Sequence, residues 1–159
     1  MYIFHGFVPT PRSTWPQRTL RVLIPIAGIL LVIQYVAGLL TNAYGPSAGF
    51  TDNTSFPALN LHYLNGDFLG VVAIIVVVVA AFTRQVRFIA LSVVMLAAIL
   101  VAGIAGMAFV SSTPNNPVDT VLMGVAFLVA FWAQLLLAFF AIMRGRGESD
   151  APPASAMSS

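Results

Sequence analysis

Four long apolar segments, separated by short polar ones, make up most of the chain. They cover about 21–43, 61–83, 87–110 and 118–142. A helix rises 1.5 Å per residue, so about 20 apolar residues cross the hydrocarbon core of a bilayer. The second segment is rich in valine and isoleucine, which favour strands in water, but an open strand in lipid would leave its backbone groups unpaired. The pattern therefore predicts an all-α integral membrane protein, a bundle of four transmembrane helices.

The composition agrees with this fold class and excludes several functions. Of the 159 residues, 59% are hydrophobic and 8% are charged, whereas soluble domains carry about a quarter charged residues. The chain has no cysteine, which excludes disulfides, thiolate metal sites and haem attachment through a CxxCH motif. The net charge is only +2 and the arginines are spread over three short segments, so we expect no nucleic-acid partner.

The placement of the basic residues predicts the orientation. Every basic residue is an arginine, and all seven lie in 12–21, 84–87 and 144–146. Four spans place these segments on one side of the membrane, and the loops 44–60 and 111–117 contain no Arg or Lys. The positive-inside rule then puts both termini in the cytoplasm. Arginine usage with abundant Ala, Val and Gly suggests a prokaryote, and hence its plasma membrane.

The two ends of the chain differ from the four spans. Residues 1–20 contain prolines and aromatic residues, which predicts a segment lying along the cytoplasmic membrane surface. Residues 143–159 are small and polar and include prolines, so they cannot bury enough apolar surface to fold. We expect a disordered cytoplasmic tail after a bundle that covers 21–142.

A short internal similarity suggests two helical hairpins in the same orientation. "VAGLLTNAYG" at 36–45 resembles "VAGIAGMAFV" at 101–110, and each precedes a Pro-containing loop and another span. Parallel repeats place equivalent positions around an axis along the membrane normal. On this alignment His62 corresponds to Met123. Histidine and methionine form the axial ligand pair of some low-spin haems.

The helix faces around these two residues admit two interpretations. His62, Gly66 and Gly70 share one stripe, and the glycines leave a gap that suits either a porphyrin edge or a neighbouring helix. Met123 shares a stripe with Phe127, and this apolar wall suits a haem or an ordinary bundle core. In the second interpretation His62 is a hydrogen-bonded interfacial residue and Met123 fills the core.

Three further polar residues lie within the predicted spans. Asp67 is about 7.5 Å deeper than His62 and about 140° around the helix, on a face that it shares with Tyr63. This pair suits a proton or quinone-headgroup contact, and the alternative is a solvated acid near the outer boundary. Gln34 and Gln134 are near the middle of the first and last spans. We expect each to form an interhelical hydrogen bond worth about 0.6 kcal/mol.

Three stretches resemble one four-helix half of the haem A synthase family. They are "VAGLLTNAYGPSAG", "LHYLNGDFLG" and "AGIAGMAFV". The resemblance implies a haem-binding, or formerly haem-binding, four-helix module. The sequence departs from the family at Leu59, where the family has an acidic residue, and at Met123, where it has a second histidine. It also lacks the family's second half and loop cysteine pair, so haem A synthesis is not implied.

Two functions follow from these features. In the first, the chain is a membrane subunit of a respiratory or electron-transfer assembly, with a b-type haem between 61–83 and 118–142 near the outer face. In the second, it is a non-catalytic accessory subunit without a cofactor, which packs against other membrane subunits. Neither makes the chain an enzyme by itself. A transporter or channel is the least favoured class, because charge within the spans is nearly absent.

Overall fold

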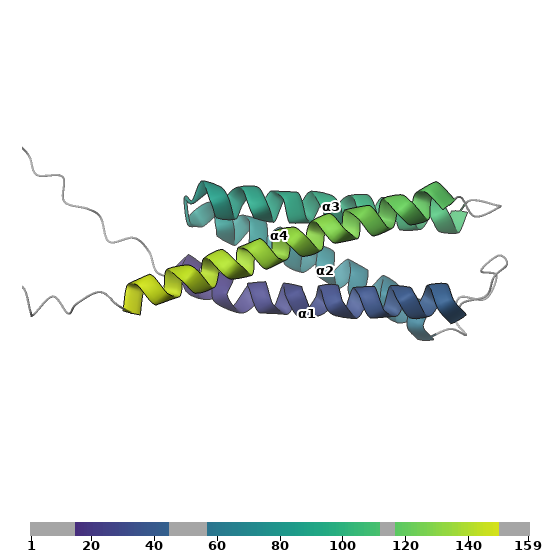
Figure 1. Ribbon diagram of the computed structural model, residues 1–159, viewed down its shortest axis with the longest axis horizontal. Helices are drawn as coiled ribbons and strands as arrows, with labels where there is room; N and C mark the ends of the chain where they lie inside the picture. Colours follow the sequence, from purple (N-terminus) through teal and green to yellow (C-terminus); the bar gives the residue numbers. More distant parts are fainter. Residues whose placement is uncertain (1–14, 45–56, 112–116, 150–159) are drawn as a thin grey trace, which may run out of the picture.

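Four helices make up nearly all of the described structure. The computed structural model describes residues 15–44, 57–111 and 117–149, and for 42–44, 110 and 144–149 the backbone alone. The helices are α1 (Trp15–Tyr44), α2 (Pro57–Phe82), α3 (Val86–Ser111) and α4 (Pro117–Ser149). Each is long and apolar enough to cross a membrane. The predicted all-α, four-span membrane bundle is confirmed (Figure 1).

Prolines mark three of the four helix starts. Pro57 and Pro117 are the first residues of α2 and α4, and Pro16 is the second residue of α1. Proline suits the first turn because the N–H that it lacks has no partner within the helix there. Proline farther inside a helix tends to end or kink it. These three prolines therefore mark where the helices begin.

Two helices extend beyond the predicted spans. α1 begins at Trp15, so residues 15–20 of the predicted surface segment are helical, and Leu20 is buried in the core. α4 continues to Ser149, so the prediction that the disordered tail begins at 143 is wrong. Hydropathy marks where a chain leaves the lipid, whereas a helix ends only where its backbone hydrogen bonds stop. The remainder of the predicted tail lies outside the described residues.

The helices form an antiparallel ring in which each packs on its chain neighbours and α4 returns to α1 (Figure 1). The pairs α1–α2 and α3–α4 share the most extensive interfaces. In the described residues, no Cα atoms of α1 and α3, or of α2 and α4, lie within 8 Å of each other. The bundle is therefore two hairpins joined along two narrower seams. The hairpin repeat proposed from the sequence requires this pairing, and the repeat itself stays a prediction.

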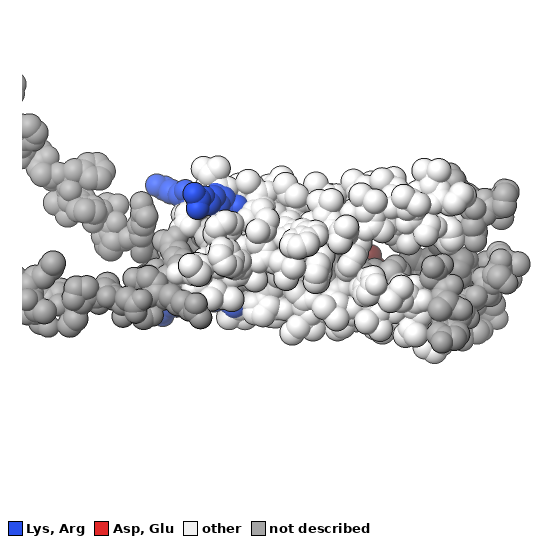
Figure 2. All heavy atoms as spheres, viewed as in Figure 1, with Lys and Arg blue, Asp and Glu red and all other residues white. Residues whose placement is uncertain are grey.

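The arginines gather at one end of the bundle, which we call the arginine end; the opposite end is the loop end. Arg18 and Arg21 lie near the start of α1, and Arg84 and Arg87 lie at the turn between α2 and α3. Figure 2 shows these charges at one end and an almost uncharged surface over the middle of the helices. The Arg87 guanidinium lies 5.7 Å from the centre of the Phe140 ring, which links α3 to α4 at this end.

The hydrophobic core lies mainly in the half of the bundle nearer the arginine end. One buried cluster takes residues from 20–31 of α1, 69–80 of α2, 88–98 of α3 and 130–137 of α4. Because the chain direction alternates, all four ranges fall in that half. Nearer the loop end, the buried residues Ala37, Leu59, Ala105 and Ala126 lie outside this cluster. α4 diverges from α1 toward the same end (Figure 1).

The turn between α2 and α3 is short and has a left-handed residue. Arg84 has a φ of 54°, a conformation that residues other than glycine adopt rarely. The Arg84 N–H donates to the Ala81 carbonyl at 3.1 Å, and the Thr83 hydroxyl accepts from the Gln85 N–H at 3.3 Å. These bonds reverse the chain within three residues and place α3 directly beside α2.

Candidate functional site

His62 lies in a polar cluster between α1 and α2. Its Nδ1 is 3.2 Å from the Gln34 carbonyl oxygen, and its Nε2 is 3.2 Å from the Gln34 side-chain nitrogen. A carbonyl only accepts and an amide nitrogen only donates, so Nδ1 carries the proton and Nε2 accepts. Gln34 thereby selects one neutral tautomer of the imidazole and engages both of its nitrogens.

Asn65 completes this cluster one turn along α2. Its Nδ2 donates to the Gln34 Oε1 at 2.8 Å and to the Leu30 carbonyl at 2.9 Å. Asn65 is only 6% exposed, and a buried amide is costly unless it is hydrogen-bonded. Both ends of the Gln34 amide are thus satisfied across the α1–α2 interface. The interhelical hydrogen bond predicted for Gln34 is confirmed.

Two glycines make room for the cluster. A Cβ added at Gly38 would lie 3.1 Å from the His62 Cε1, and one added at Gly66 would lie 3.3 Å from the Gln34 Nε2. Both distances are tighter than ordinary van der Waals contact, so a side chain at either position would require His62 or Gln34 to shift by a few tenths of an ångström. The gap predicted beside His62 therefore exists at Gly66, and Gln34 fills it. At Gly70 an added Cβ would meet nothing within 4 Å.

Met123 and Phe127 of α4 face other helices. The Met123 sulfur lies 3.5 Å from the position of a Cβ on Gly106 of α3. The Phe127 ring stacks on Tyr35 of α1 with a centroid distance of 5.5 Å. His62 contacts α1 and Met123 lies beside α3, and no described Cα atoms of α2 and α4 are within 8 Å of each other. His62 and Met123 thus lie against different neighbouring helices, and Gln34 is hydrogen-bonded to the nitrogen that an iron would need. The haem predicted between them stays a prediction.

Asp67 and Tyr63 lie together on a different face of α2. Both are exposed, and they project about 100° or more away from His62 around the helix. Asp67 has no hydrogen bond or ion pair with the described residues. A charged carboxylate at the centre of a bilayer costs about 2.5–3.5 kcal/mol on insertion scales, and less near an interface. Its position ten residues into α2 puts it about 15 Å along the helix axis.

A second polar contact joins α4 to α1. The Gln134 side-chain nitrogen donates to the Ile24 carbonyl, which confirms the predicted interhelical hydrogen bond. Gln134 is 4% exposed, and its Oε1 has no partner among the described residues. The amide also lines a groove of about 650 Å³ between α1 and α4, whose wall includes Pro25, Gly28 and Phe131.

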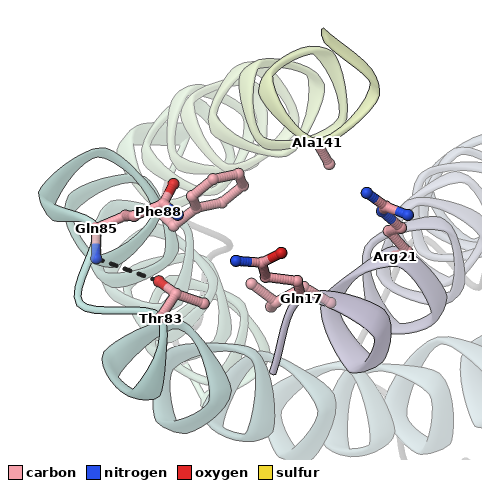
Figure 3. Close-up of a pocket in the computed structure, with 7 residues that line it drawn as sticks. Gln17, Arg21, Thr83, Gln85, Phe88 and Ala141 are labelled. Atoms are coloured by element: carbon pink, nitrogen blue, oxygen red, sulfur yellow. Dashed lines mark hydrogen bonds between the residues drawn. The ribbon is translucent and has the colours of Figure 1, made fainter. Parts of the chain in front are cut away.

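A smaller cavity lies at the arginine end, lined by residues of α1, α3, α4 and the turn between α2 and α3 (Figure 3). Its volume is about 20 Å³, which is room for one water molecule. Figure 3 shows the side chains of Gln17, Arg21 and Thr83 around this space, with Phe88 beside them. Polar groups around a space of this size suit a bridging water and leave no room for a cofactor.

The sequence did not single out Asn65 or Gly38, although both belong to the cluster. Asn65 is three residues after His62 and on the same stripe of the helix, so its spacing could have identified it as a neighbour of His62. From the sequence, Gly38 can be recognised only as a small residue that lets α1 approach another helix. That it meets His62 depends on how α1 packs on α2.

Among the described residues, no three His, Cys, Asp or Glu side chains lie close enough to hold a metal ion. Comparisons of the chain with protein-family models, curated protein sequences and solved structures find no match. The resemblance to haem A synthase and the haem itself stay predictions.

Proposed function

We propose that this chain is an accessory subunit of a larger membrane assembly, in which its polar residues hold its own helices together. The observation that carries the proposal is the His62 cluster. Both imidazole nitrogens bind Gln34, and Asn65 binds the other end of the same amide. The histidine is thereby used as a link between α1 and α2.

A second observation supports the same function. The Gln134 amide attaches α4 to α1 at the Ile24 carbonyl, next to Pro25. α1 therefore receives a polar contact from α2 near the middle of its span and another from α4 closer to the arginine end. Such a bundle is a stable body that other subunits can pack against.

The proposal includes an orientation. The arginine end faces the cytoplasm of a prokaryote, because arginines are retained on the cytoplasmic side of the plasma membrane. The loop end, and the His62 cluster with it, then lies in the outer half of the bilayer.

Purification from native membranes tests the accessory role. The full chain with a C-terminal tag is extracted in a mild detergent, and its mass and composition are measured. We expect a stoichiometric complex with at least one other membrane protein. A chain that elutes alone from gentle detergent and remains folded would contradict the proposal.

One observation favours a second function, a b-type haem held by His62. In metal-binding histidines one ring nitrogen commonly donates to a backbone carbonyl, which leaves the other nitrogen for the metal. His62 has this tautomer, with Nδ1 donating to the Gln34 carbonyl. A haem would supply one-electron transfer, and the Gln34 amide would first have to move away from Nε2.

A reduced-minus-oxidised absorption spectrum distinguishes the two functions. If His62 binds haem, the purified protein shows an α-band that disappears in His62→Ala and persists in Gln34→Ala, which exposes Nε2. Met123→Leu tests the predicted second ligand through a change in the band or the potential. The absence of an α-band in the wild-type protein would remove the haem function and leave the accessory role standing.

A further inference from the structure

The face of α2 that projects away from α1 has polar residues in the half of the helix nearer the loop end. Asn60, Tyr63 and Asp67 are exposed there, at positions that lie one above another on the helix. Farther along the same face, Ile74 is 51% exposed. In a bilayer this surface would meet lipid tails, which offer no hydrogen bonds to Asp67.

In the part of the chain that the structure describes, no basic side chain pairs with Asp67. The chain has no Arg or Lys between residues 22 and 83, or between 88 and 143. The arginines that the structure describes belong to the arginine end, and the loop between α1 and α2 contains none. His62 is the one histidine in the spans, and both of its nitrogens are engaged with Gln34. An Arg or Lys at the depth of Asp67 would therefore come from another polypeptide.

Gly70 gives this face a place for close approach. It follows Asp67 by three residues, so it lies one turn deeper on the same side of α2. A Cβ at Gly70 would meet nothing within 4 Å, whereas the space beside Gly66 is filled by the Gln34 side chain. Small residues let two membrane helices come close enough for side chains to pair. Gly70 is open in the isolated chain, and an approaching helix would fill that space.

We infer that the α2 face of Tyr63, Asp67, Gly70 and Ile74 binds a transmembrane helix of a partner subunit, and that this helix has an Arg or Lys that pairs with Asp67. The inference rests on the proposed accessory role and names the partner's chemistry. A second copy of this chain does not suit the face. Its described arginines lie at the arginine end, away from the depth of Asp67, and two Asp67 carboxylates would repel each other.

Photo-crosslinking in native membranes identifies what covers the face. A photoreactive amino acid replaces Ile74, and the matched control replaces Leu128 of α4, which is 54% exposed. We expect the Ile74 probe to join the chain to a membrane-spanning peptide that contains an Arg or Lys, and the Leu128 probe not to join that peptide. Crosslinks from Ile74 only to lipid, or only to a second copy, would overturn the inference.

Charge reversal tests the pairing itself. Asp67→Lys should lower the recovery of the crosslinked partner by roughly tenfold or more, because it replaces an attraction with a repulsion. Replacing the partner's basic residue with Asp should restore recovery. Asp119→Lys, at the start of α4, is the control and should leave recovery unchanged. The thermal unfolding of each variant, measured in detergent, should match that of the wild type.

The outcomes separate this inference from the proposed function. A complex that forms equally well with Asp67→Lys overturns the inference and leaves the accessory role intact. A wild-type chain that purifies alone contradicts both.

Discussion

Individual glycines decide how closely α1 and α2 can approach. Gly38 and Gly66 touch the polar cluster, while Gly70 and Gly103 face open space. The four residues look alike in the sequence, yet their contacts divide them into two kinds. A methyl group is therefore expected to be costly at the first two positions and harmless at the others.

We predict that Gly38→Ala destabilises the bundle by about 1–3 kcal/mol, the usual cost of overpacking. The new Cβ would lie 3.1 Å from the His62 ring, which two hydrogen bonds hold in place. Unfolding of the purified chain in detergent, followed by circular dichroism, measures the change.

Gly70→Ala is the matched control. Its Cβ meets nothing in the isolated chain, so alanine should be neutral or stabilise the helix by up to about 1 kcal/mol. Equal destabilisation by the two substitutions would mean that the contact at Gly38 has no energetic weight.

Asn65 is the second residue whose removal should be measurable. Asn65→Leu removes two hydrogen bonds and leaves the Gln34 Oε1 without its donor. At about 0.6 kcal/mol for each bond within a membrane, we expect a loss of roughly 1 kcal/mol in unfolding free energy. Asn60→Leu, on the exposed side of the same helix, should have little effect. A neutral Asn65→Leu variant would show that the cluster does not hold the hairpin together.

At the scale of elements, the turn between α2 and α3 has the clearest local strain. Arg84 takes a left-handed conformation at the end of α2, where many helices have glycine. A residue less suited than glycine thus holds this conformation, at a cost to the backbone.

Arg84→Gly should therefore stabilise the isolated bundle by up to about 1 kcal/mol, because glycine has no Cβ to oppose a positive φ. Arg84→Val should destabilise it, since a branched Cβ suits that conformation worst. Asn tolerates the left-handed region, so Arg84→Asn separates the loss of charge from the backbone effect. The three unfolding midpoints in detergent should rank Gly, Asn, Val. Any ranking with Val first would contradict the backbone explanation.

At the scale of the whole molecule, the two hairpins join at the arginine end. The core cluster lies in that half, and α4 diverges from α1 toward the loop end. The part of the bundle in which the hairpins are less tightly joined therefore also contains His62 and Asp67. In the proposed assembly, the half at the arginine end would hold the hairpins together, and the half at the loop end would present the partner-binding face of α2.

The orientation can be measured because the chain has no cysteine. Val86→Cys and Ser111→Cys place single thiols at the two ends of α3, both at exposed positions. With an impermeant maleimide on intact cells, we expect labelling at 111, and labelling at 86 only after permeabilisation. The reverse pattern would place the arginine end outside and invert the proposed topology.

Much of this architecture was predictable because the bilayer imposes strong constraints. Lipid cannot satisfy backbone groups, so four apolar runs of sufficient length had to be helices. Gln34 and Gln134 had to find partners across an interface for the same reason, and both do. Helix ends were less predictable at Trp15 and Ser149, since a helix can continue past the lipid boundary.

The sequence by itself determined the number of spans, the end at which the arginines gather and the need for interhelical hydrogen bonds, because these depend on transfer of groups from water to lipid. Only the tertiary structure decided which helix each polar group meets. His62 faces α1 and Met123 faces α3, since α2 and α4 lie across the ring from each other. Periodicity gives the direction of a side chain around its own helix, and the partner in that direction depends on the packing of the whole bundle.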